Sequence, residues 1–204
     1  MPKRPATTKD ARMRQLVTQE AARIMAEEAI SDYLVAKRKA AERLGAPDTR
    51  NLPTNREIQD ALIDHQRLFG GAGRPALLRR LRQVAVEAVA SLRRFEPRLV
   101  GSVLHGTATE HSDVNLHVFA ETPEEVAFFL MDQGIPYEVV ERRFRFGREE
   151  PVGVPAYRFV AGDVPVELAV FSVNGLREAP RSRIDGQPMV RAALGAVREQ
   201  LAAT

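Results

Sequence analysis

Length, composition and charge place this chain among ordinary globular proteins. It has 204 residues, of which 44% are hydrophobic and 28% charged, enough for one generous domain or two small ones. The net charge of +3 permits an anionic partner such as a nucleotide or RNA, although an arginine-rich solvated surface explains it more simply. With no cysteine, disulfide bonds, thiolate zinc sites and cysteine nucleophiles are excluded. No apolar run approaches the roughly 18 residues that span a bilayer, so we expect a cytoplasmic protein with no membrane attachment.

The beginning of the chain is predicted to be a tail followed by a long helix. Residues 1–11 are basic, lack the apolar segment of a secretory signal and are interpreted as a disordered tail. Residues 12–44 contain no Gly or Pro and repeat apolar side chains near helical spacing, which predicts one basic helix. We expect this helix to pack against the next helices or against a second subunit, so that oligomers would form through this region. RNA binding is the alternative.

Two further helices are predicted before the pattern changes. Thr54 and Glu57 have the spacing of a capping box, and Gly70-Gly71 ends the helix that they begin. The next helix has Pro75 near its first turn, a position where the missing N–H of proline costs nothing.

The second half of the chain has the short alternating apolar runs of strands. We expect strands at 98–104 and 114–120, a helix between Thr122 and Gly134, a strand at 137–146, a hairpin of 156–160 with 164–172, and a last helix at 187–201. This order predicts an α+β fold. Its parts would be a helical N-terminal region at 12–74 and a second domain at 75–204.

The segment GSVLHGTATEHSDVNL, which begins at Gly101, has the residues of a phosphate-binding loop. Glycine lets the backbone approach a ligand closely, and the hydroxyl of Ser102 adds a donor. The small residues from Gly106 onward can present backbone N–H groups to a phosphate. Asp113 and Asn115 are two positions apart and therefore share one face of the following strand, while their neighbours point into the core.

This arrangement resembles the polymerase-beta-like nucleotidyltransferase superfamily, especially its minimal, antitoxin-type members. Those proteins carry Gly-Ser, three residues, Gly, and then Ser-Asp-x-Asp-Leu. The matching residues here are Gly101-Ser102, Gly106, Ala108 and Ser112-Asp113-Val114-Asn115-Leu116. A third family carboxylate lies on a later strand, where this chain has Glu167 within VPVELAVF. The resemblance covers about residues 75–175 and implies a nucleotidyltransferase-like core, a mixed sheet flanked by helices.

The resemblance also implies a chemistry. In the family, three carboxylates hold two Mg²⁺ ions that activate a hydroxyl acceptor and stabilise the departing pyrophosphate. By position, Asp113, Asn115 and Glu167 correspond to the metal ligands, and Asp113 and Glu167 to the catalytic carboxylates. Nucleotide binding would fall to Gly101, Ser102, Gly106 and Asn115. The expected substrate is a nucleoside triphosphate, and the expected acceptor is a hydroxyl of RNA, a protein or a small molecule.

Asn115 departs from the family pattern, in which this position is an aspartate shared by both metal ions. An amide oxygen is neutral, holds a dication more weakly and cannot accept a proton. Glu167 in place of aspartate changes reach but not charge, and His105 stands where minimal members often have arginine. Two hypotheses remain: a divergent enzyme that transfers a nucleoside monophosphate with Mg²⁺, or a catalytically degenerate module of the same fold that binds nucleotide, RNA or a protein without turnover.

The histidines and arginines of the second half are open to two interpretations each. His105, His111 and His117, with Asp113, have the residue types of a transition-metal site, but exposed loop histidines with His117 on the face of Asp113 are the simpler prediction. Four arginines interleaved with two phenylalanines either contact nucleic acid or triphosphate or keep an edge strand soluble; they are Arg142, Arg143, Arg145 and Arg148, with Phe144 and Phe146. Arg181 and Arg183 either clamp phosphate or lie on a solvated loop.

Overall fold

The structure is a computed structural model, which describes residues 8–28, 30–47, 51–69, 71, 73–147 and 150–204. The chain divides into two compact units. The first unit comprises Met1–Gly71 with Arg183–Asp185, and the second comprises Ala72–Ser182 with Gly186–Thr204. Within the described residues, no helix combines the length and the apolarity needed to cross a membrane.

The first unit is built from helices α1 (Thr8–Glu27), α2 (Tyr33–Arg43) and α3 (Asn55–Phe69). Their buried side chains form one apolar cluster: Val17, Ala21, Ala22, Ile24 and Met25 of α1, Ala36, Ala40 and Ala41 of α2, and Ile58 and Leu62 of α3. The small alanines of α2 let its backbone lie close to α1, since burying alanine requires little space between two helices.

The single helix predicted at 12–44 is wrong, because α1 and α2 are separate helices. Asp32 caps the N-terminus of α2: its side chain accepts hydrogen bonds from the backbone N–H groups of Leu34 at 2.8 Å and Val35 at 3.0 Å. A short acidic side chain gives the backbone this alternative to a continuous helix. The predicted tail at 1–11 is also wrong for residues 8–11, which belong to α1; residues 1–7 lie outside the described residues.

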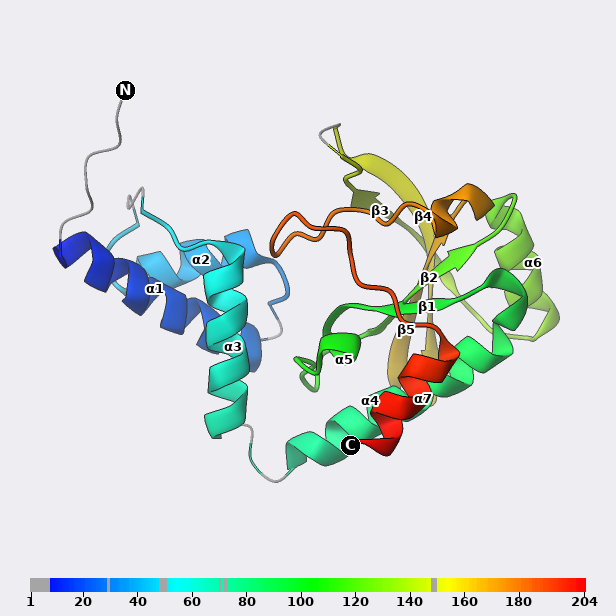
Figure 1. Cartoon of the computed structure of the whole chain (residues 1–204), viewed down its shortest axis with the longest axis horizontal. Helices are drawn as coiled ribbons and strands as arrows, with labels where there is room; N and C mark the ends of the chain where they lie inside the picture. Colours follow the sequence, from blue (N-terminus) through cyan, green and yellow to red (C-terminus); the bar gives the residue numbers. More distant parts are fainter. Residues whose placement is uncertain (1–7, 29, 48–50, 70, 72, 148–149) are drawn as a thin grey trace. The chain divides into compact units, whose positions relative to one another are not determined.

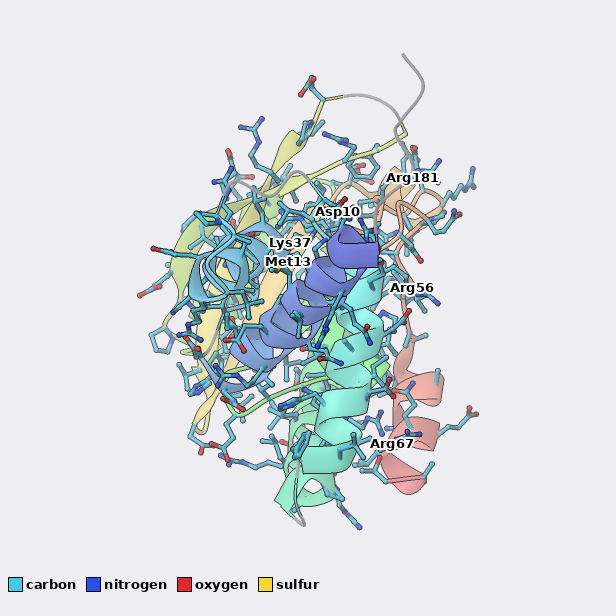
Figure 2. The ribbon with its side chains drawn as sticks, turned by 90° about the vertical axis from the view of Figure 1, so that its left-hand side faces the viewer. Asp10, Met13, Lys37, Arg56, Arg67 and Arg181 are labelled. Atoms are coloured by element: carbon cyan, nitrogen blue, oxygen red, sulfur yellow. The ribbon has the colours of Figure 1, made fainter. Side chains whose placement is uncertain are left out.

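The capping box predicted at the start of α3 is confirmed. The backbone N–H of Thr54 donates to the Glu57 carboxylate at 2.6 Å, and the backbone N–H of Glu57 donates to the Thr54 hydroxyl at 3.2 Å. Figure 2 shows Arg56 and Arg67 near the opposite ends of α3. Gly70, predicted to end this helix, lies outside the described residues.

The second unit confirms the predicted fold class, α+β with a mixed sheet flanked by helices. Its described residues form a five-stranded sheet in the order β1-β2-β5-β4-β3. The strands are β1 (Arg98–Val100), β2 (Val114–Phe119), β3 (Glu138–Phe144), β4 (Val152–Ala161) and β5 (Val164–Phe171). The pair β2–β5 is parallel and the other pairs are antiparallel. The helical elements are α4 (Gly73–Ser91), η1 (Arg93–Phe95), α5 (Gly101–His105), α6 (Pro123–Asp132), η2 (Val173–Leu176) and α7 (Leu194–Ala202).

The two faces of the sheet differ in what they carry. Helices α4, α6 and α7 contribute to the main core together with the alternate side chains of β2 and β5 that include Val114, Leu116, Val166 and Leu168 (Figure 1). The opposite face carries a smaller apolar cluster around Phe119 and Phe171 and, nearer the start of β2 and β5, polar side chains. Because strand side chains alternate, burial of one face by helices leaves the other for a site.

Local signals predicted several of these elements well and two of them poorly. The predicted capping box of α6 is confirmed, with the Thr122 backbone N–H donating to Glu125 at 3.2 Å. The strand predicted at 98–104 is wrong beyond Val100, because Gly101 starts α5. The last helix is shorter than the predicted 187–201, since Ala192 pairs with β1 instead: its backbone N–H donates to the Leu99 carbonyl at 2.9 Å.

Replacing the cap of α2 should destabilise the helical unit. We predict that Asp32→Ala lowers the free energy of unfolding by about 1 kcal/mol, because two backbone N–H groups lose their acceptor, whereas Asp32→Asn keeps that acceptor and most of the stability. Urea unfolding followed by far-UV circular dichroism measures both. Equal unfolding midpoints for wild type and Asp32→Ala would contradict the capping role.

Candidate functional site

The candidate site begins with the register of β2, β5 and β4. Asn115 of β2 pairs with Glu167 of β5, and Glu167 pairs with Arg158 of β4. Directly opposed residues on adjacent strands project from the same face. Asp113, which precedes β2, completes this polar group, because its carboxylate accepts a hydrogen bond from Arg158, the residue that pairs with Glu167 in the register.

Glu167 is held by an arginine from the edge of the sheet. The Arg142 side chain of β3 donates from Nε to one carboxylate oxygen at 2.7 Å and from Nη2 to the other at 2.5 Å. Two parallel bonds of this kind fix both groups in one plane. The Glu167 side chain is 9% exposed and that of Arg142 is 45% exposed, so the carboxylate is more deeply buried than the arginine that binds it. Hydrogen bonding to Glu167 raises the pKa of Arg142 further.

Asp113 is also paired with an arginine, less tightly. Arg158 Nη2 lies 3.2 Å from one oxygen of Asp113 and 3.4 Å from the other. Burial raises the pKa of Asp113 above its usual value, although the charge of Arg158 opposes the rise, and the nearby carboxylate of Glu167 adds to it. The site is therefore a cluster of alternating charge, in which two carboxylates are compensated by two guanidinium groups.

A small cavity opens beside this cluster. Its volume is about 120 Å³, and its lining includes Gly101, Asn115, Glu167 and His117 with the apolar side chains of Val100, Leu116, Phe144, Ala169 and Met189. Gly101 has φ = +77°, a conformation in which a side chain is strained. A Cβ there would lie 3.7 Å from the Asn115 amide nitrogen, an ordinary contact distance, so the positive φ, and not a lack of space, favours glycine.

Two predicted loop residues, Ser102 and Gly106, are not part of the lining of this cavity. Ser102 lies in the first turn of α5 and is partly buried. Gly106 ends α5 in the left-handed conformation, and its carbonyl accepts a hydrogen bond from Arg74 of α4 at 2.5 Å. Gly106 therefore joins the loop to α4, at the opposite end of α5 from Gly101. The two glycines predicted as one loop have different structural roles.

The amide of Asn115 faces its own chain. Its Nδ2 donates to the backbone carbonyl of Asp113 at 3.1 Å, which stabilises the turn into β2. This contact requires an amide N–H, since an aspartate carboxylate has no donor when ionised. Asn115 thus supports the entry to the strand as well as lining the cavity.

The three histidines differ in exposure as predicted, although His105 ends α5 instead of lying on the loop. His105 and His111 are exposed, whereas His117 is 2% exposed and lies two residues after Asn115 on the same face. Arg191 donates from Nε to His117 Nδ1 at 3.1 Å, which leaves the proton of a neutral imidazole on Nε2. Burial, with the charge of Arg191, lowers the pKa of His117 to about 3. The ring packs edge-on against Phe144, with 5.3 Å between centroids.

Two arginines of the site gave a weaker signal in the sequence. The predicted basic run lies partly on β3, which is an edge strand as expected. Arg143 is exposed, whereas Arg142 binds Glu167 in the site. Arg148 lies outside the described residues. Arg158 was not predicted. Side chains alternate along β4, so Arg158 lies on the face opposite the buried Tyr157 and Phe159. An arginine between two apolar residues was the feature of the sequence that could have identified it as a site residue.

The side chains as arranged do not fit a two-magnesium site. Magnesium prefers six oxygen ligands in octahedral geometry. Here both oxygens of Glu167 accept from Arg142, Asp113 is paired with Arg158, and Asn115 directs an N–H toward the carbonyl of Asp113. Within the part of the chain that the structure describes, no group of three or more His, Cys, Asp or Glu side chains is placed to hold a metal. The predicted magnesium ligands stay a prediction.

Comparison with known proteins gives one weak structural similarity. No protein-family profile and no curated protein sequence matches the chain. Among solved structures, it is similar to that of Cid1 in complex with the UTP analogue UMPNPP, with a TM-score of 0.33 and 16% sequence identity. The similar region covers 46% of this chain and 30% of that chain.

The buried imidazole should make stability depend on pH. Near pH 7 and above, His117 is neutral in both the folded and the unfolded protein. Below about pH 6.5 the unfolded chain takes up a proton that folded His117, with its pKa of about 3, does not. The free energy of unfolding then falls by up to about 1.4 kcal/mol per pH unit, until about pH 3.

His117→Asn isolates this effect, because asparagine retains an acceptor near Nδ1 for Arg191 and does not titrate. We predict that the variant loses less stability than wild type on acidification, measured by urea unfolding from about pH 7.5 to 4. The difference between the two free energies of unfolding at pH 7.5 corrects for the different packing of histidine and asparagine. Parallel pH profiles for the two proteins would show that folded His117 titrates normally. Arg191 and the Glu167 carboxylate across the cavity are the charged groups beside the ring.

Proposed function

We propose that this chain is a nucleotidyltransferase-fold module that binds a nucleoside triphosphate without magnesium-dependent transfer. One observation carries the proposal: Asp113 and Glu167, the carboxylates that the resemblance assigns to metal ions, are both paired with arginines. The positive charge that balances these two carboxylates therefore comes from the protein's own arginines. Magnesium would have to displace two guanidinium groups before it found ligands.

Further support comes from the neighbours of this pair. Asn115 replaces the carboxylate that two metal ions would share, and its amide N–H is used by the Asp113 carbonyl. Gly101, with φ = +77°, lines the cavity beside it. The cavity of about 120 Å³ is smaller than the roughly 300 Å³ at which sites for drug-sized ligands begin. It suits one small group of a nucleotide, and the rest of the ligand would lie over the open face.

Transfer of a nucleoside monophosphate to a hydroxyl is the second candidate function. It is favoured by the register pairing of Asn115 with Glu167 and by the interaction of the Asp113 and Glu167 charges. This function requires Arg142 and Arg158 to leave their partners when ligand binds. RNA and protein are the candidate acceptors of such a transfer.

Binding and transfer can be separated by the role of magnesium. We predict that calorimetric titration with ATP, GTP, CTP and UTP gives affinity for at least one nucleotide that changes less than about threefold when EDTA replaces magnesium. We also predict no labelled product when the protein is incubated with labelled nucleotide, magnesium or manganese, and cell extract that supplies RNA and protein acceptors.

Asn115→Asp is the matched variant. Restoring the third carboxylate should not produce transfer, because Arg142 still occupies Glu167 and the new side chain lacks the N–H that the Asp113 carbonyl accepts. Nucleotide binding that disappears with the chelator, or labelled product that Asp113→Ala abolishes, would contradict the proposal and establish the second candidate.

A further inference from the structure

We propose that Arg142 and Arg158 bind the phosphates of the ligand, with Glu167 and Asp113 acting as anchors that orient them. This inference rests on the proposed function and assigns the residues that perform it. In this arrangement two guanidinium groups hold the charge for which a nucleotidyltransferase uses two magnesium ions. The carboxylates then touch arginine and not metal.

The Arg142 side chain retains unused hydrogen-bond donors after it binds Glu167. A guanidinium group carries five N–H bonds, and the pair with Glu167 uses Nε and one N–H of Nη2. No described residue accepts from Nη1. Since the side chain is 45% exposed, the outer edge of the fork faces solvent. That edge matches the geometry of two phosphate oxygens.

Arg158 offers a second fork beside the first. It uses Nη2 for Asp113, no described residue accepts from its Nε or Nη1, and its side chain is 41% exposed. It stands opposite Glu167 in the register of β4 and β5, so both arginines surround the same carboxylate. Two neighbouring forks suit a chain of phosphates better than a single phosphate or a carboxylate.

Burial explains why an anion would meet these cations before it meets the carboxylates. The side chains of Glu167 and Asp113 are 9% and 22% exposed, about a half or less of the values for their arginine partners. The negative groups therefore lie on the protein side and the positive groups on the solvent side. The ion pairs also remove most of the rotamer freedom that a free arginine loses on binding phosphate, which favours binding.

The opposite interpretation of the same contact is a plug, in which Arg142 blocks a metal site. The two interpretations predict opposite results for Arg142→Gln. If the arginine binds phosphate, its removal weakens the binding of polyphosphate in the presence of a chelator. If it is a plug, its removal frees Glu167, and binding becomes tighter and dependent on magnesium.

The test measures the binding of sodium tripolyphosphate and of the preferred nucleotide to the full chain in EDTA. We expect Arg142→Gln and Arg158→Gln each to weaken binding by about tenfold or more, as loss of a charge-assisted contact implies. The matched control is Arg143→Gln, from the same strand but the opposite face, which should bind within about twofold of wild type. Arg142→Lys retains the charge without the fork and should recover only part of the affinity.

A second variant distinguishes weaker binding from misfolding. It is needed because Arg142→Gln leaves the Glu167 carboxylate buried without a counter-charge. In Arg142→Gln with Glu167→Gln, both groups are neutral and can still hydrogen-bond. This double variant should fold with near wild-type thermal stability and bind tripolyphosphate about tenfold or more weakly.

The outcomes separate this inference from the proposed function. If wild type binds nucleotide in EDTA and the variants at 142 and 158 bind equally well, the inference is overturned and the proposed function stands. If wild type binds no nucleotide in EDTA, both are overturned. A magnesium-dependent gain in Arg142→Gln establishes the plug instead.

Discussion

The bidentate pair between Arg142 and Glu167 joins the edge strand β3 to the parallel strand β5 across the whole width of β4. In the register, Arg142 pairs with Val154 of β4, and Glu167 pairs with Arg158 of the same strand. A buried carboxylate demands compensation, because an unpaired charge in such a place costs several kcal/mol. Glu167 therefore requires a cation, which β3 supplies from the far side of β4.

The parallel pairing of β2 with β5 provides the second constraint. It places Asn115 directly beside Glu167, and Gly101, where β1 gives way to α5, lines the same cavity as that pair. Helices α4, α6 and α7 supply the core on the other face. The polar group consequently lies on a rigid sheet, with short connections at its end, which is the arrangement that holds side chains precisely for binding.

Sequence patterns predicted the parts of this molecule that depend on local chemistry. The capping boxes at Thr54 and Thr122 and the hairpin of β4 with β5 follow from residues a few positions apart, and they were found. The break before α2 was missed, because one aspartate at position 32 competes with an uninterrupted helical pattern. The pairing of Arg142 with Glu167 was not predicted, because these residues lie 25 positions apart on β3 and β5, and no local pattern encodes which side chains of separate strands meet.

The proposed function, with guanidinium groups in place of magnesium, limits what this site could do chemically. A metal ion lowers the pKa of a bound hydroxyl and polarises the phosphoryl group as a Lewis acid. An arginine can neutralise the same oxygens through oriented hydrogen bonds, but it binds no acceptor hydroxyl as a metal does and accepts no proton. Asn115 cannot accept a proton either, and both oxygens of Glu167 are engaged by Arg142. In the proposed function the arginines would bind phosphate, while the two carboxylates that could activate an acceptor, Asp113 and Glu167, are both paired with arginines.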